Sequence, residues 1–186
     1  LIKKINDKNF DIIEIHNRPL ILSKLIDKIN TRFIFYFHND PLSMKGSKNI
    51  SEKLFILKNS DKIVFVSEWV RERFFLDLDK KLASKTEVIY PSVSKQPAIK
   101  KENIITFVGR LNYSKGYDIF NKAIVKILNM FPQWKAISVG DEIRRSIYIN
   151  HHNHKELGFL NHKKTLDILN KSEIAVVPSR WEEPFG

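Results

Sequence analysis

Seven short segments rich in Ile, Val and Phe constrain the fold more than any other feature of this sequence, because their apolar residues follow one another without alternation. A β-strand of that kind is buried on both faces, which is typical of a parallel sheet covered by helices. The segments are DIIEIH (11–16), RFIFYFH (32–38), KIVFVS (62–67), EVIYPS (87–92), NIITFVG (103–109), KAISVG (135–140) and EIAVVPS (173–179).

Segments with the periodicity of amphipathic helices separate these strands, and they lie at 20–30, 51–59, 68–76, 115–130 and 162–171. Strand and helix in regular alternation predict a doubly wound α/β fold. Ser51, Ser67 and Ser114 are the predicted N-caps of three of these helices.

The chain is expected to form two domains. Residues 91–102 contain prolines, several lysines and few large apolar residues, so we place the boundary there and the domains at 1–95 and 96–186. The first strand follows the N-terminus almost at once, and PSRWEEPFG stops just after the last strand. We therefore expect both domains to be incomplete and the chain to be an internal piece of a longer protein.

Composition excludes several classes of protein. Without cysteine there is no disulfide framework, no thiolate metal site and no thiol nucleophile. The net charge of +11 is dispersed, with 18 basic and 12 acidic residues up to position 95 (+6) and 14 basic and 9 acidic residues beyond it (+5). A dispersed charge is typical of solvated lysines rather than of a dedicated polyanion site.

One turn in the second half has the chemistry of an anion site. The strand ending at Gly109 is followed by Arg110, and by Lys115 and Gly116 at a predicted helix start. A strand that turns through glycine into a helix presents backbone N–H groups to an anion, and the two cations suit a diphosphate. A surface Arg and Lys beside a tight turn is the plainer alternative.

Further motifs agree with that turn in order and spacing. They are FVGRLNYSKGYDIFNKAI, KAISVGD, ELGFL and ILNKSEIAVVPSRWEEPFG. Together they resemble the C-terminal domain of the retaining family-4 glycosyltransferases (glycosyl transferases group 1), which have the GT-B fold. RFIFYFHND, KIVFVSEWVRERF and EVIYPSV resemble later strands of that family's N-terminal domain.

The resemblance implies two Rossmann-like parallel-sheet domains. Residues 1–95 would be the C-terminal part of the acceptor-side domain, and residues 96–186 the N-terminal part of the domain that binds the nucleotide sugar. Gly109, Arg110 and Lys115 match the diphosphate-binding turn of the family, in which the basic pair stabilises the leaving group. Glu183 matches the first Glu of a two-glutamate motif that faces the donor sugar, and the second Glu would lie beyond Gly186.

Further residues match the family elsewhere. Phe159 and Leu160 fall on the segment after a short strand whose backbone reads the donor base. His38 matches an active-site His close to the transferred sugar, whereas a lone His at a strand end is otherwise a structural group. The segment 16–18 is expected to form a hydrogen-bonded loop, with lining of the acceptor side as the alternative.

Other clusters are not expected to be sites. No carboxylate or cysteine stands at ligand spacing beside His151, His152 and His154, so we predict no metal site there. The two acids after KAISVG, at 141–142, are expected to form a solvated loop. Trp134 is predicted to pack in the core, as is Trp181, which could alternatively form a wall of the donor pocket.

The resemblance implies an enzyme that moves a sugar, with retention, from a nucleotide-diphosphate sugar to a glycan, a lipid-linked acceptor or a small molecule. We expect no cofactor apart from that donor substrate and no nucleic-acid partner. Polysaccharide biosynthesis and a cytoplasmic location are expected, with peripheral contact with the inner face of the membrane left open. The alternatives are a fragment that binds nucleotide sugar without catalysis, and a basic protein that binds anionic lipid or nucleic acid.

Overall fold

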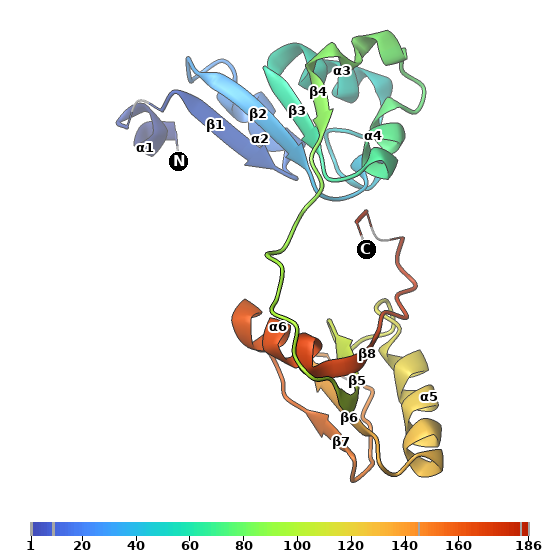
Figure 1. The fold of residues 1–186 in the computed structure, drawn as a ribbon. Coiled ribbons are helices and arrows are strands. Elements are labelled where there is room, and N and C mark those ends of the chain that lie inside the picture. The colour runs from blue at the N-terminus through green and yellow to red at the C-terminus, as the bar shows by residue number, and fades with distance from the viewer. Residues whose placement is uncertain (1, 9, 145, 183, 186) are drawn as a thin grey trace. The chain divides into compact units, whose positions relative to one another are not determined.

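A computed structural model describes residues 2–8, 10–144, 146–182 and 184–185. These residues divide into two compact units. Unit 1 holds the described residues up to Val93 together with Pro184 and Phe185, and unit 2 holds those from Ser94 to Glu182. Residues 89–101, which connect the units, contain neither helix nor strand (Figure 1).

Unit 1 is a parallel sheet of order β1-β2-β3-β4 with helices packed against it. The strands are β1 (Ile12–His16), β2 (Arg32–Phe37), β3 (Lys62–Phe65) and β4 (Thr86–Val88). The helices are α1 (Ile2–Asn6), α2 (Pro19–Leu25), α3 (Ile50–Asn59) and α4 (Glu68–Phe75), with 3-10 helices η1 (Pro41–Ser43) and η2 (Lys80–Lys85).

The core of unit 1 lies on one face of its sheet. Phe33, Phe35 and Phe37 alternate along β2 and are at most 2% exposed. Their neighbours on the other face, Ile34 and Tyr36, are only half-buried. The expectation that the strands are buried on both faces is therefore only partly met by β2, which shows the alternation of a strand with one shielded face.

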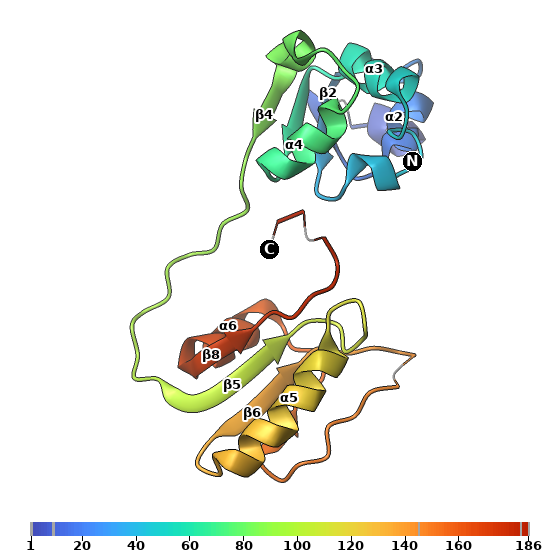
Figure 2. The same ribbon diagram turned by 90° about the vertical axis from the view of Figure 1, so that its right-hand side faces the viewer.

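Unit 2 is a second parallel sheet, of order β7-β6-β5-β8. Helices α5 and α6 lie on opposite sides of it (Figures 1 and 2). The elements are β5 (Glu102–Val108), α5 (Tyr117–Met130), β6 (Lys135–Val139), β7 (His154–Glu156), α6 (His162–Lys171) and β8 (Ser172–Val176).

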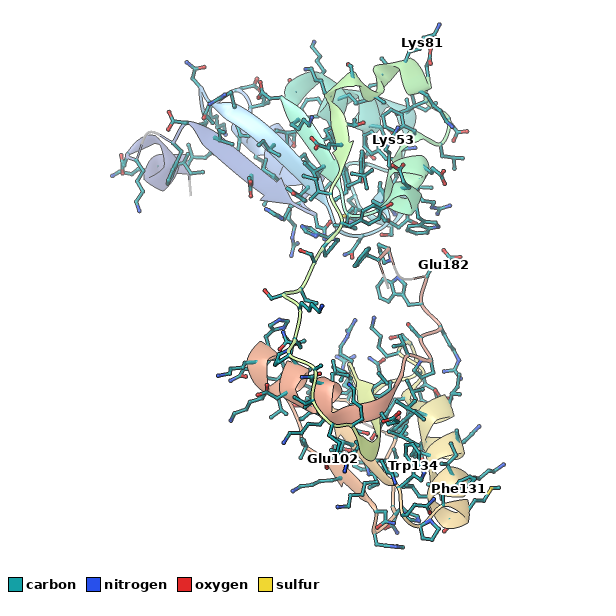
Figure 3. The ribbon with its side chains drawn as sticks, viewed as in Figure 1. Lys53, Lys81, Glu102, Phe131, Trp134 and Glu182 are labelled. Atoms are coloured by element: carbon teal, nitrogen blue, oxygen red, sulfur yellow. The ribbon has the colours of Figure 1, made fainter. Side chains whose placement is uncertain are left out.

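The core of unit 2 joins β5 to the buried stripe of α5. Phe107 contacts Tyr117 and Phe120, with ring centroids 5.0 and 5.4 Å apart. Trp134, labelled in Figure 3 beside Phe131 at the end of α5, packs partly buried against this core as the sequence predicts. One strand departs from expectation: in β8 the consecutive residues Glu173, Ile174 and Ala175 are exposed, so neither face is well covered, and within the described residues β8 is an edge strand that pairs with β5.

The alternation of parallel strands and helices confirms the predicted α/β class. Four short elements of the described chain were not predicted from the apolar segments: α1, β7 and the 3-10 helices η1 and η2. Each is too short to show a hydrophobic period. Within the part of the chain that the structure describes, every helix is too short or too polar to span a bilayer.

Two predicted helix starts in unit 1 had different outcomes. Ser67 caps α4 by accepting a hydrogen bond from the backbone N–H of Val70, as predicted. The prediction of Ser51 as the cap of α3 is wrong, since Asn49 takes that position. Asn49 accepts from the N–H of Glu52, and the Glu52 carboxylate accepts from the N–H of Asn49, which forms a capping box.

Candidate functional site

The carboxyl edge of the sheet in unit 2 is made by three glycines in direct backbone contact. The N–H of Gly109 donates to the carbonyl of Val139 at 2.9 Å, and the N–H of Gly140 donates to the carbonyl of Gly158 at 2.8 Å. A Cβ atom on Gly140 would lie 1.8 Å from the carbonyl oxygen of Gly109. No side chain fits at position 140 unless these loops move apart.

Two adjoining hollows open at this edge, and we call them together the β5–β6 cavity. The first measures about 270 Å³ and the second about 390 Å³, and both are lined by Arg110, Asp141 and Phe159. The aromatic ring of Phe159 is exposed to solvent, since the residue is 83% exposed. The remaining lining residues are Val108, Gly109, Val139, Gly140, Glu142, Ile143, Leu160 and Thr165.

The structure thus gathers four of the residues singled out in the sequence, Gly109, Arg110, Phe159 and Leu160, around one cavity. Lys115 does not line it but lies beside it. The Lys115 side chain approaches within 4.0 Å of where a Cβ on Gly109 would be. Its ammonium lies 5.9 Å from the ring centroid of Trp181, which is 47% exposed. Trp181 is therefore a partner for a cation rather than a core residue.

The turn from β5 into α5 is organised by Asn112, which sequence reasoning missed. Its side-chain oxygen accepts from the hydroxyl of Ser114 at 2.8 Å and from the N–H of Lys115 at 3.2 Å. Its amide donates to the Glu142 carboxylate at 2.7 Å. One indication of this role was present in the sequence: Asn112 lies in a loop between a strand and a helix, where Asn side chains commonly form hydrogen bonds with the nearby backbone.

The sequence suggested a solvated loop at 141–142, but Glu142 is hydrogen-bonded to the neighbouring turn. The hydrogen bond from Asn112 holds the pKa of Glu142 below its ordinary value, with help from the N–H of Arg144 and from the charge of Arg110. The Glu142 carboxylate therefore stays ionised and pins the loop after β6 to the turn after β5. Arg110 consequently belongs to a turn that is hydrogen-bonded to the neighbouring loop.

The segment after β8 holds the same turn from another side. Gly116, not Ser114, is the N-cap of α5, and it adopts a left-handed conformation with φ of 70°. A Cβ on Gly116 would lie 1.9 Å from the carbonyl oxygen of Pro178. Arg180 forms a two-pronged ion pair with Asp118 on α5, and one prong measures 2.8 Å. Glu183, the predicted partner of the donor sugar, lies outside the described residues.

In unit 1, the strand ends carry a stack of side chains. The rings of His16 and Tyr36, which are paired in register across β1 and β2, lie 5.0 Å apart and nearly parallel. His38 extends the stack, with its ring centroid 5.1 Å from that of His16. His16 Nδ1 and His38 Nε2 are 2.8 Å apart, and His16 Nε2 lies 3.3 Å from the Glu14 carboxylate.

These distances fix the tautomers of the two rings when both rings are neutral. An ionised carboxylate only accepts hydrogen bonds, so His16 must donate to Glu14 through Nε2. His16 Nδ1 then accepts from the N–H at Nε2 of His38. Burial lowers the pKa of His38, and a positive charge on His16 would lower it further, so the neutral form of the His38 ring is favoured. The remaining nitrogen of His38, Nδ1, carries a lone pair.

Asn17 fixes the backbone on which His38 sits. Asn17 has a positive φ of 53° and directs its side-chain oxygen to the N–H groups of His38, at 2.8 Å, and Asn39, at 3.3 Å. The hydrogen-bonded loop expected at 16–18 is therefore present.

The histidines of the 151–154 segment are engaged in structural contacts. The hydroxyl of Ser138 and His154 Nε2 are 2.9 Å apart, and the rings of His151 and His152 stack with centroids 4.4 Å apart. Among the described residues, no three His, Asp or Glu side chains gather closely enough to hold a metal ion.

Two curated relatives are similar to the whole chain. An uncharacterized 41.2 kDa protein in the cps region of Klebsiella pneumoniae is 26% identical, covering 100% of this chain and 58% of its own length. The putative glycosyltransferase YtcC of Bacillus subtilis is 26% identical, covering 99% of this chain and 53% of its own length. The chain thus spans little more than half the length of these relatives.

Solved structures agree on the fold. HepE of Anabaena, solved in complex with UDP and glucose, superposes with a TM-score of 0.73 and 17% identity, covering 100% of this chain and 57% of HepE. TarM of S. aureus superposes with a TM-score of 0.70 and 14% identity, covering 100% of this chain and 40% of TarM. These likenesses confirm the predicted GT-B fold.

The family itself is identified by the second half of the chain. The sequence model described as "Glycosyl transferases group 1" matches residues 91–186, which include every residue of the β5–β6 cavity. With a match over more than half of its length, this chain belongs to the glycosyl transferases of group 1.

Proposed function

We propose that the protein is a retaining glycosyltransferase of family 4 that takes a sugar from a nucleoside-diphosphate sugar. The β5–β6 cavity carries this proposal, since it combines a glycine-built edge, Arg110 and an exposed aromatic ring at the ends of parallel strands. Such edges are where α/β sheets bind nucleotides. The complexes of HepE with UDP-glucose and with UDP and glucose are in keeping with this proposal.

In the proposed donor complex, the diphosphate lies against the turn from β5 into α5. Arg110 contacts it through its guanidinium fork and Lys115 through its ammonium. Both cations stabilise the charge that develops on the diphosphate as the glycosidic bond breaks. Phe159 and Leu160 lie at the base end of the donor. For Glu183, which lies outside the described residues, we keep the role that the family resemblance implies, contact with the donor sugar. We expect no metal in this scheme, because the two cations offset much of the negative charge of the leaving group.

On unit 1, we assign His38 to the reacting groups. Its Nδ1 is the nitrogen left over by the bond to His16, and it accepts a hydrogen bond from a hydroxyl of the sugar or of the acceptor. His16 and Glu14 are positioning residues that keep this lone pair available. The acceptor is a glycan, a lipid-linked sugar or a small molecule, and the relative from the cps region of Klebsiella pneumoniae is in keeping with polysaccharide biosynthesis. We place the reaction in the cytoplasm, with peripheral contact with the inner face of the membrane left open.

Isothermal titration calorimetry with UDP tests the donor site. Arg110→Ala and Lys115→Ala should each weaken binding by about 1.5 to 3 kcal/mol, or roughly 10- to 150-fold, because each removes a bond to a charged group. Lys122→Ala, on the exposed side of α5, makes the same change of charge and should bind like the unmodified protein. Equal affinity in all four proteins would refute the donor site.

Retention is tested on the product. The anomeric proton coupling in the NMR spectrum of the transferred sugar should match that of the donor sugar. An inverted coupling would contradict the assignment to a retaining family.

A further inference from the structure

Unit 1 contains a second cavity, which opens beside the carboxyl end of β1. It measures about 460 Å³ and lies between the start of α2 and the segment that follows η1. We call it the basic cavity. Its lining residues are Asn17, Arg18, Pro19, Leu20, Ile21, Lys24, Met44 and Lys45.

The walls of the basic cavity are held in place by close packing. A Cβ on Gly46 would lie 3.0 Å from side-chain atoms of both Pro19 and Leu20, so the 44–46 segment rests directly on the start of α2. Ser47 is fully buried, and its hydroxyl donates to the carbonyl of Pro41 at 2.7 Å. The cavity is therefore a formed feature of the fold rather than a gap between loose loops.

The charge of the basic cavity is uncompensated. Three of its lining residues, Arg18, Lys24 and Lys45, are cations, and no lining residue is an acid. Within the described chain, none of the three forms an ion pair, although carboxylates elsewhere pair with Arg71, Arg73 and Arg180. The three cations are exposed, so solvent screens their mutual repulsion, but a bound anion with more than one charge would be attracted by all three.

Asn17 connects the basic cavity to His38. This residue lines the cavity, and its side-chain oxygen accepts from the N–H of His38 at 2.8 Å. A molecule whose anionic group is held in the cavity would therefore have its next groups beside the His16–Tyr36–His38 stack.

We propose that the basic cavity binds a phosphate or diphosphate group of the acceptor, and so selects acceptors that carry one. The proposal rests on the proposed function, which places the acceptor hydroxyl near His38. Arg18 supplies a guanidinium fork and the two lysines supply point charges, which is a donor set suited to phosphate oxygens. Leu20, Ile21 and Met44 form the apolar part of the same lining.

The first test uses inorganic pyrophosphate as the probe. The donor site is silenced by Arg110→Ala combined with Lys115→Ala, and binding is measured by calorimetry in that background. Adding Arg18→Ala or Lys45→Ala should weaken binding at least tenfold, whereas adding Lys81→Ala, an exposed lysine on η2 labelled in Figure 3, should leave it unchanged. No binding of pyrophosphate in the background protein, or equal affinity in all variants, would overturn the proposal.

The second test distinguishes the source of the phosphate. Sedimentation is compared for vesicles of phosphatidylcholine with and without phosphatidic acid. A lipid-borne phosphate predicts sedimentation with phosphatidic acid alone and its loss in Arg18→Ala. A soluble phosphate ester predicts pyrophosphate binding without sedimentation. Both outcomes support phosphate binding in the basic cavity. Neither outcome depends on UDP affinity, and UDP affinity is the measurement that tests the proposed function.

Discussion

The carboxyl edges of the two sheets are built from different parts of the chain. In unit 2 the edge is backbone, with glycines in contact and the N–H of Gly140 bonded to the carbonyl of Gly158. In unit 1 the edge is side chain, with the His16–Tyr36–His38 stack at the strand ends. An edge built from backbone is fixed and leaves room for a large ligand. An edge built from side chains presents Nδ1 of His38, and the hydrogen bond to His16 determines which nitrogen of that ring is protonated.

Under the proposed function, this difference separates binding of the donor from the reaction. Rigid backbone and two cations suit a ligand with a diphosphate, and they offer no group that can exchange a proton near neutral pH. A neutral His with an assigned tautomer suits contact with a hydroxyl. Substitutions can therefore impair each edge separately.

The largest effect is expected at Gly140. Gly140→Ala places a methyl group 1.8 Å from the carbonyl oxygen of Gly109, so the loops must separate. We expect a loss of stability of about 3 kcal/mol, as for severe overpacking, together with a loss of UDP binding. Urea unfolding and calorimetry measure the two effects.

Gly158→Ala is the matched control for that experiment. Gly158 also has a positive φ, of 66°, but nothing lies within 4 Å of the added methyl group. It should lose only about 1 to 2 kcal/mol through backbone strain. Equal losses at both positions would show that the close approach of the backbones is not what matters at this edge.

A smaller effect is expected at His16. His16→Phe keeps an aromatic ring in the stack but removes the hydrogen bond to His38. Nitrogen-15 NMR should show His38 protonated at Nε2 in the unmodified protein and a mixture of tautomers in the variant. We expect the transfer rate to fall roughly 10- to 100-fold, part of the roughly 10²- to 10⁴-fold that a positioned acid or base contributes.

His151→Phe, in unit 2, controls for the loss of a histidine and should change neither measurement. A single, unchanged tautomer of His38 in His16→Phe would contradict the assignment of His16 as a positioning residue.

Much of the fold followed from the pattern of apolar segments, because buried strands and amphipathic helices have strong periods. The α6 helix occupies the predicted residues 162–171. Shorter features did not follow, since a three-residue strand such as β7 has no period, and local hydrogen bonds decide a cap. Ser51 and Asn49 are both good capping residues, and only the geometry of the turn selects Asn49.

The candidate site followed less from periodicity than from resemblance. Arg110 and Phe159 are 49 positions apart, and only the order of the strands brings them to one cavity. The bond between Asn112 and Glu142 was not foreseen. Asn112 lies in the motif around the β5–α5 turn but had no role assigned to it, Glu142 lies outside the quoted motifs, and both belong to loops. The basic cavity was hidden for the same reason: Arg18 and Lys45 belong to loops that meet only in the folded unit.

The most direct test of the separation between the two edges is the UDP affinity of His38→Ala compared with that of Arg110→Ala, each measured beside its rate of sugar transfer. We expect His38→Ala to bind UDP within twofold of the unmodified protein but to transfer little sugar, and Arg110→Ala to lose at least tenfold in affinity. A His38→Ala protein that loses UDP affinity, beside an Arg110→Ala protein that keeps it, would contradict this separation of the two edges.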